Sequence, residues 1–379
     1  MLWAQSPLLL RTLKVSKIRS NIKSGQYILS KLFFQDKPII GVDISQTGIK
    51  VMAVDTSHWT VTGYGSIDLD PVEAQKSIDG DGAYLGQSIR TVLKDKKIGK
   101  ITTNHAVLSI PTSKTYARTF SIPNKDAGNL KDAIALEIEQ YIPVPVSQLY
   151  VDSQVIGRDK QNTTVQLCAV PINTVDTCVA AANSAGLEVV MVEPSVNAIA
   201  RLLAFAEEGG LPTVIVDIGP AATDIAILDG NIRVSGSIAV GGNTFTLDIA
   251  KKLNIPLESA HQLKVQHGLA VSPRQKKIED AIEPNLKRIL VEIKKIMRYY
   301  TERLDSEKRL EQIVIVGGGS NVPGLGDYFT NALIMPARVA SPWQILNFGE
   351  LEQPPKQFKA RYITVAGLAS IKPKEIFAS

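Results

Sequence analysis

Two aspartates occupy the same place in two near-identical segments that lie far apart in the chain. The segments are Ile40-Gly-Val-Asp-Ile-Ser45, with Asp43, and Val214-Ile-Val-Asp-Ile-Gly219, with Asp217; each leads through a tight turn into a second apolar run. Such a hairpin can aim backbone N–H groups at a phosphate, while the carboxylate holds a metal ion or its waters. Because the unit occurs twice, we expect two lobes that face one phosphate chain.

A third segment, Ile313-Val-Ile-Val-Gly-Gly-Gly-Ser320, joins a buried-type strand to three consecutive glycines. Glycine has no Cβ atom, so the backbone can approach a ligand closely there. Each segment also has a simpler explanation, because aspartate is common where strands end and glycines form close-packed turns. The occurrence of all three segments in one chain favours phosphate binding.

The segments around these residues show strand-like and helix-like periodicity. After a hairpin over 40–55, we expect strands at 60–65, 106–110, 115–122, 149–156 and 164–170, and helices at 82–94, 129–142, 173–185, 193–203, 243–253, 286–304 and 363–371.

These elements predict two α/β lobes. The expected organisation is a basic N-terminal extension at 1–37, a first lobe at 38–211 with an α+β insert at about 104–182, a second lobe at 212–345, and a segment at 346–379 that returns to the first lobe.

The charge of the 379-residue chain is concentrated at its start. The formal net charge is +5, and residues 1–37 alone contribute +6, which leaves the rest of the chain at −1. A basic nucleic-acid-binding body is therefore disfavoured. The two cysteines are expected to be buried, reduced thiols, and the four histidines lack the spacing of zinc ligands.

The extension at 1–37 places a short apolar block before its basic residues, the reverse of a secretory signal. A basic, partly amphipathic segment could lie on an anionic membrane surface. A disordered extension is the alternative. No apolar run is long enough to span a bilayer.

Five further blocks occur in the order and at the spacing of one protein family. The chain resembles PilM, the type IV pilus assembly protein of the actin-like ATPase superfamily, over about residues 38–372. The blocks are Glu137-Ile-Glu-Gln-Tyr-Ile-Pro-Val-Pro145, Leu149-Tyr-Val-Asp152, Val240-Gly-Gly-Asn-Thr-Phe-Thr246, Gly317-Gly-Gly-Ser-Asn-Val-Pro-Gly324 and Ser341-Pro-Trp343.

The resemblance implies a two-lobed actin-like ATPase fold of ribonuclease H-like domains, with an insert like that of the division protein FtsA. It also implies ATP and magnesium in the interlobe cleft. The residues that match the family's nucleotide-binding motifs are Asp43, Ser45, Thr47, Asp217, Gly219, Thr223, Gly241, Gly242, Gly317, Gly318, Gly319 and Ser320, with Asp43 and Asp217 as magnesium ligands, directly or through water.

Two positions depart from the superfamily pattern. Ser45 stands where glycine is usual and restricts the turn, and Pro220 follows Gly219 and removes one backbone donor. Both argue against fast hydrolysis, so we expect at most a weak ATPase. On the 286–304 helix, Lys295 is either an adenosine contact or part of a solvated face.

The resemblance implies that a PilN-like single-pass inner-membrane protein is the partner and binds through its N-terminal cytoplasmic tail. The segment Tyr141, Ile142, Pro143 and Val144 is apolar and stiffened by proline, which suits an extended peptide, although proline after a helix is also a common stop.

The leading functional hypothesis is a cytoplasmic ATP-binding scaffold at the inner face of the cytoplasmic membrane. Pilus motor ATPases and further copies of the chain are additional candidate partners. The alternatives are a small-molecule kinase of the same superfamily, which would need a catalytic base beside the γ-phosphate, and an FtsA-like division filament protein.

Overall fold

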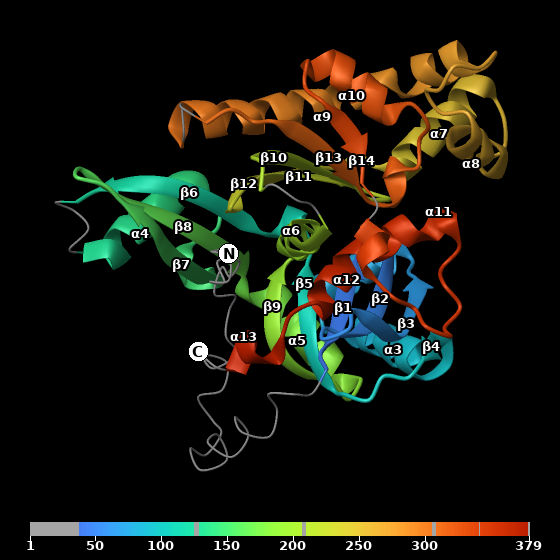
Figure 1. The fold of residues 1–379 in the computed structure, drawn as a ribbon. Coiled ribbons are helices and arrows are strands. Elements are labelled where there is room, and N and C mark those ends of the chain that lie inside the picture. Colours follow the sequence, from blue (N-terminus) through green and yellow to red (C-terminus); the bar gives the residue numbers. More distant parts are fainter. Residues whose placement is uncertain (1–37, 125–128, 207–209, 305–307, 341, 378–379) are drawn as a thin grey trace. The chain divides into compact units, whose positions relative to one another are not determined.

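The computed structural model describes residues 38–124, 129–206, 210–304, 308–340 and 342–377 (Figure 1). The extension at 1–37, with its expected membrane contact, lies outside the described residues. The chain divides into two units, which are treated separately below. Unit 1 comprises residues up to 206 together with 344–353 and 364–379, and unit 2 comprises 207–343 and 354–363.

The central sheet of unit 1 has the strand order β4-β3-β2-β1-β5-β9. Strands β1 to β4 pair in antiparallel fashion, whereas β5 and β9 extend the sheet from β1 in parallel. The strands are β1 (Ile40–Ser45), β2 (Gly48–Asp55), β3 (Thr60–Asp68), β4 (Lys97–Gly99), β5 (His105–Ile110) and β9 (Glu188–Pro194).

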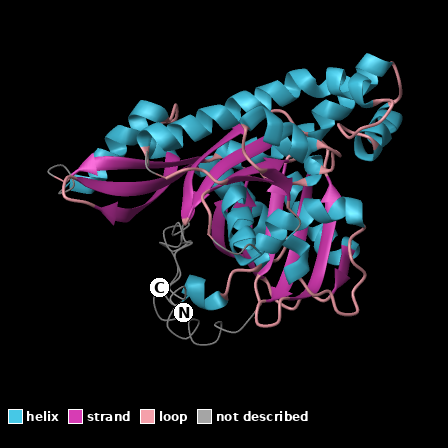
Figure 2. Ribbon diagram, turned by 45° about the horizontal axis from the view of Figure 1, so that its top comes forward, coloured by secondary structure: helices cyan, strands magenta, loops and turns pink. Residues whose placement is uncertain are grey.

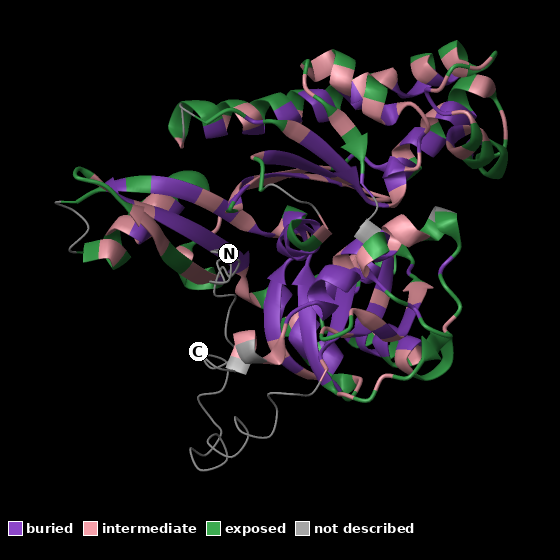
Figure 3. Ribbon diagram, in the orientation of Figure 1, coloured by how far each residue is buried: buried purple, intermediate pink, exposed green. Residues whose placement is uncertain are grey.

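Alternate residues of these strands pack on opposite faces of the sheet. One face is covered by α2 (Pro71–Asp79), α3 (Ala83–Thr91) and α5 (Ile172–Ser184). The other face carries α6 (Ser195–Ala206) and α12 (Ile363–Ala369). Figure 3 shows buried residues concentrated on these strands. Gly41 permits the close approach of α12, because a Cβ there would lie 2.6 Å from the Val365 oxygen.

The insert of unit 1 is a three-stranded antiparallel sheet in the order β6-β8-β7 with one helix. Its elements are β6 (Tyr116–Pro123), α4 (Leu130–Tyr141), β7 (Leu149–Arg158) and β8 (Asn162–Pro171). Ile134 and Ile138 of α4 pack on Phe120, Val165 and Leu167 of the strands. The insert therefore has a small core of its own.

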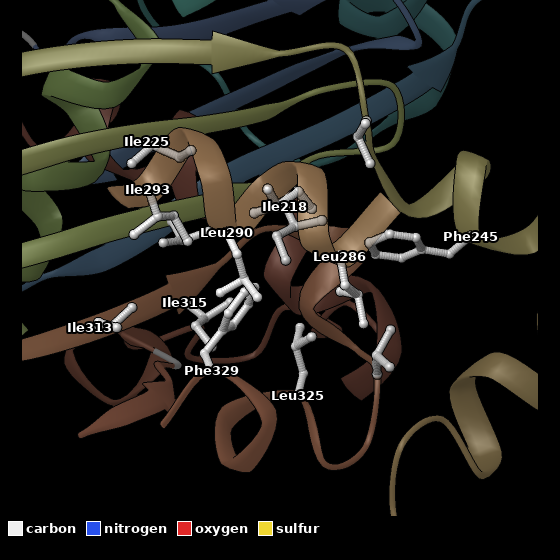
Figure 4. Close-up of a cluster of buried hydrophobic side chains, with 14 of the residues drawn as sticks. Ile218, Ile225, Phe245, Leu286, Leu290, Ile293, Ile313, Ile315, Leu325 and Phe329 are labelled. Carbon is white, nitrogen blue, oxygen red and sulfur yellow. The ribbon is translucent and has the colours of Figure 1, made fainter. Parts of the chain in front are cut away.

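Unit 2 has a mixed sheet in the order β14-β13-β10-β11-β12. The strands are β10 (Thr213–Ile218), β11 (Thr223–Asp229), β12 (Asn231–Ile238), β13 (Gln312–Val316) and β14 (Ala337–Val339). The helices are α7 (Gly242–Leu253), α8 (Leu257–Gln266), α9 (Gln275–Arg303), α10 (Leu325–Leu333) and the short α11 (Lys356–Lys359) (Figure 2). Ile218, Leu290 and Phe329 lie in its core (Figure 4).

Two of the expected helix limits are wrong. The helix expected at 193–203 begins at Ser195, because Glu193 and Pro194 end strand β9. The helix expected at 286–304 begins earlier, at Gln275, and continues through Pro284. Proline removes one helical hydrogen bond, but the buried residues Ile278 and Ile282 continue the apolar face of α9 through this turn.

Candidate functional site

In unit 1, the β1–β2 hairpin holds the carboxylate of Asp43 between two partners. Lys50 lies directly opposite Asp43 in the antiparallel pair, and its Nζ is 2.9 Å from Asp43 Oδ2. Ser109 Oγ donates to Asp43 Oδ1 at 2.8 Å and accepts from the Ile44 N–H at 3.2 Å. Asp43 is buried. The Lys50 ammonium thus already supplies a positive charge at the position where a metal ion was expected.

The turn of this hairpin accommodates Ser45 without strain. Ser45 Oγ donates to the Gly48 oxygen at 2.8 Å, and the Thr47 oxygen accepts from the Leu69 N–H at 3.1 Å. Among the described non-glycine residues, positive φ occurs only at Trp59, Asn254 and Ile334. Ser45 therefore closes the turn through its own hydroxyl rather than through glycine-like backbone freedom.

Asp43 belongs to a polar row across the carboxyl ends of parallel strands. Asp43 of β1 is level with Ser109 of β5, and Ser109 is level with Glu193 of β9. Glu193 is buried and pairs with Arg201 of α6 at 2.8 and 2.6 Å, and Arg201 also donates to the Gly367 oxygen of α12. The two acids of the row thus each have a basic partner.

The second hairpin, in unit 2, has a different charge pair at the same place. Asp217 of β10 lies directly opposite Asp224 of β11. Directly opposed residues in an antiparallel pair share one face of the sheet, and like charges there repel. Two adjacent carboxylates favour a cation, and Mg²⁺ is commonly held by one or two carboxylates together with phosphate oxygens and water.

The turn after Asp217 is tied to the start of α7. The Gly219 N–H donates to the Ala222 oxygen at 2.9 Å, the Gly242 N–H to the Gly219 oxygen at 2.9 Å, and the Asn243 N–H to the Pro220 oxygen at 2.8 Å. A Cβ at Gly241 would lie 2.5 Å from the Gly219 oxygen, so only glycine permits this approach. Thr223 Oγ1 donates to the Val240 oxygen at 2.7 Å, which fixes the start of β11 to the same loop.

The glycine run after β13 packs against β10. Gly317 has φ of +87°, and a Cβ there would overlap Asp217 Oδ1. A Cβ at Gly319 would lie 2.5 Å from Ile218 Cγ2. Ser320 Oγ donates to the Gly317 oxygen at 2.6 Å and closes the turn η6 (Gly318–Ser320). Asp217, Gly219, Gly241, Gly242 and the run 317–320 therefore meet in one unit.

A buried lysine lies beside these glycines. Lys264 Nζ of α8 donates to the Gly242 oxygen at 2.7 Å and to Thr246 Oγ1 at 2.8 Å. Burial lowers the pKa of Lys264 to about 8. Among the described residues no carboxylate pairs with this ammonium group. A buried charge with neutral partners is costly, so an anion bound here would supply the missing counter-charge.

Sequence reasoning missed Lys50, Asp224 and Lys264. A signal existed for two of them, since Lys50 and Asp224 each stand seven positions after the matching aspartate. Lys295, which was predicted as an adenosine contact or a solvated lysine, is 72% exposed, and its Nζ lies 3.0 Å from Glu292 Oε1 of the same helix. This geometry favours the solvated face.

The expected partner segment lies at the end of α4. Tyr141 is 53% exposed, and the Arg118 Cζ lies 3.4 Å from the centroid of its ring. Pro143 is exposed and Val144 half-buried, whereas Ile142 is buried in the core of the insert. Tyr141 and Pro143 are therefore the parts of this segment that a peptide can reach.

Within the described ranges, no three or more His, Cys, Asp or Glu side chains gather as a metal site. The carboxylate pair of the second hairpin is a smaller group and needs ligand oxygens to complete a magnesium shell.

None of the helices in the described part of the chain combines the length and the apolar character needed to cross a membrane.

The two units, each with a hairpin that carries an aspartate, define a two-lobed actin-like ATPase fold. The family model of the type IV pilus assembly protein PilM matches residues 41–371, and the chain belongs to this family. This finding confirms the resemblance seen in the sequence.

A solved structure titled PilM-PilN type IV pilus biogenesis complex has a similar fold. Its TM-score is 0.71 at 20% identity, over 88% of this chain and 98% of that chain. Among curated relatives, the cell division protein FtsA of Borreliella burgdorferi is 31% identical over 170 residues, which cover 40% of this chain and 41% of FtsA. FtsA of Pseudomonas aeruginosa is 25% identical over 260 residues, which cover 59% and 60%. The chain thus matches less than two thirds of these relatives.

Proposed function

We propose that this chain is an ATP-binding scaffold of type IV pilus assembly that binds the N-terminal cytoplasmic tail of a PilN-like inner-membrane protein. It would work in the cytoplasm at the inner face of that membrane. The observation that carries the nucleotide part is the buried Lys264 ammonium, which lacks a carboxylate partner among the described residues and lies beside the glycines of unit 2.

The residues of unit 2 fit a magnesium nucleotide. Gly241, Gly317 and Gly319 leave no room for a Cβ because they pack against the Gly219 turn and the end of β10, which brings the Gly219 turn, the start of α7 and η6 together beside Lys264. The opposed carboxylates of Asp217 and Asp224 suit a cation. When bound, the magnesium nucleotide brings negative charge that the Lys264 ammonium can balance.

The contacts of the acidic residues Asp43 and Glu193 favour a scaffold over a sugar kinase. A kinase needs a carboxylate that can accept the proton of the substrate hydroxyl. In the polar row of unit 1, both oxygens of Asp43 have partners, and Glu193 is buried against Arg201. Pro220 has no N–H to donate in the second turn. Weak or absent hydrolysis is therefore expected.

The partner part of the proposal is supported by the family and by the exposed end of α4. The PilM of the similar solved structure forms a complex with PilN. In this chain, the Tyr141 ring is exposed and held by Arg118. A pre-ordered aromatic side chain binds an apolar peptide with a smaller entropy cost.

The pH dependence of ATP binding tests the role of Lys264. Its pKa is lowered to about 8, so it loses its proton as the pH rises through that value, and ATP affinity should fall between about pH 7.5 and about pH 9.5. Without ligand, the stability of the protein should rise from about pH 8 to about pH 10.5, between the pKa in the folded protein and the ordinary lysine value, because the lowered pKa means that folding penalises the charged form. Calorimetry and thermal unfolding measure the two effects.

Lys264→Met should bind ATP weakly and without this pH dependence. The matched control is Lys287→Met, since Lys287 is an exposed lysine of α9 in the same unit. If Lys264→Met showed the pH profile of the parent, Lys264 would have no part in binding.

Tyr141→Ala should weaken the binding of a labelled PilN-like N-terminal peptide by at least about fivefold, equivalent to about 1 kcal/mol. The ring is exposed, so its loss should leave the fold intact, and Lys131→Ala at the other end of α4 is the matched control. Fluorescence anisotropy measures the affinity, and circular dichroism checks the fold. An unchanged affinity of a folded Tyr141→Ala protein would remove this surface from the interface.

A further inference from the structure

Residues 354–363 form a return segment that belongs to unit 2, although its neighbours on both sides in the chain belong to unit 1. Within unit 2, α11 and the turn η8 (Ala360–Tyr362) both pack on the glycine turn η6. A Cβ at Gly318 would meet only Arg361 Cγ, at 3.1 Å. The aliphatic part of the Arg361 side chain therefore packs on the η6 turn at Gly318, which has no Cβ.

Ring contacts hold the return segment in place. The rings of Trp343 and Tyr362 meet edge to face with centroids 6.3 Å apart, and Lys359 Nζ lies 5.9 Å from the Trp343 ring. Trp343 is buried. These contacts give a structural role to Trp343, the last residue of the Ser341-Pro-Trp343 motif, because they fix the short turn that carries Arg361.

The Arg361 guanidinium is oriented by an aromatic ring. Its Cζ lies 5.5 Å from the centroid of Phe358, which is 41% exposed. The pKa of His261 on α8 is lowered by burial, then by the charge of Lys264 and, to a smaller extent, by the charge of Arg361, which is therefore near this residue. Arg361 and the buried Lys264 thus both lie close enough to His261 to act on its charge.

We propose that Arg361 is the base-contacting residue of the nucleotide site, and that Trp343 is its positioning residue. The proposal rests on the proposed function, namely that unit 2 binds ATP. A planar guanidinium stacks on aromatic planes, and a purine base is such a plane. Gly317 and Gly319 face β10, whereas Gly318 faces Arg361. The phosphates are expected at the Gly219 turn, so Arg361 is placed to contact the nucleoside instead.

The test compares two ligands on the full-length protein by calorimetry: ATP and inorganic tripolyphosphate, each with magnesium. Arg361→Ala should weaken ATP about tenfold and leave tripolyphosphate unchanged, since stacking on a base is lost and phosphate contacts are not. Arg309→Ala is the matched control, because Arg309 is an exposed arginine of the same unit. Trp343→Leu should lower ATP affinity in the same way, and the double variant should lose no more than Arg361→Ala alone.

Equal ATP affinity of parent and Arg361→Ala would overturn this inference and leave the proposed function standing. An equal loss for both ligands would overturn it as well, because Arg361 would then contact phosphate. Additive losses in the double variant would remove the positioning role of Trp343. A parent that binds neither ligand would overturn the proposed function, and the inference with it.

Discussion

Asp217→Ala should lower the affinity for magnesium ATP by about a hundredfold. The change removes one of two directly opposed carboxylates on β10 and β11, and with it the charge that would hold the cation. A charge-assisted interaction in a partly buried site is worth about 2–3 kcal/mol, which corresponds to this loss. Isothermal calorimetry on the full-length protein measures it.

Asp217→Asn separates binding from folding. The amide keeps the shape of the side chain beside Gly317 and removes its repulsion with Asp224. The variant should fold at least as stably as the parent and still bind magnesium ATP weakly. Asp327→Asn on α10 of the same unit is the matched control. Full ATP affinity in a folded Asp217→Asn protein would exclude Asp217 from the site.

Arg201→Met should produce the largest loss of stability. Glu193 and Arg201 are both buried, and Arg201 also donates to the Gly367 oxygen, so one side chain connects β9, α6 and α12. Removing one partner of a buried ion pair costs about 3–5 kcal/mol, because the other charge stays buried and unpaired. Denaturant unfolding measures this cost.

The double variant Arg201→Met with Glu193→Gln should recover part of the loss, since no buried charge remains. Arg90→Met is the matched control, because Arg90 is an exposed arginine of the same unit that donates to the Ser184 oxygen. A loss no larger than that of Arg90→Met would mean that the pair contributes little to the fold.

The hairpins and single elements of the fold could be predicted, because they depend on local sequence patterns. The duplicated apolar runs around Asp43 and Asp217 predicted two hairpins, and the register of β1 with β2 and of β10 with β11 confirms them. The strands expected at 115–122, 149–156 and 164–170 and the helix expected at 129–142 also agree with β6, β7, β8 and α4. The alternation of apolar and polar residues in a strand and the helical spacing of apolar residues in a helix are both visible in a single sequence.

Other features depend on contacts between distant residues and could not be read from local patterns. Helix α8, which carries Lys264, has only two buried residues, so its apolar period is faint. The hydrogen bond from Arg201 to the Gly367 oxygen and the contact of Arg361 with Gly318 join segments that only the folded chain brings together. The helix expected at 286–304 begins at Gln275, before Pro284, because the buried stripe of α9 outweighs the hydrogen bond that the proline removes.

The most direct test of the account is a titration of the full-length protein with magnesium ATP, followed by phosphate release from the same sample. We expect one saturable ATP site per chain, with phosphate released slowly or not at all, because Pro220 has no N–H to donate in the turn of the second hairpin. The absence of saturable binding, or rapid transfer of phosphate to water or to a sugar, would contradict the account.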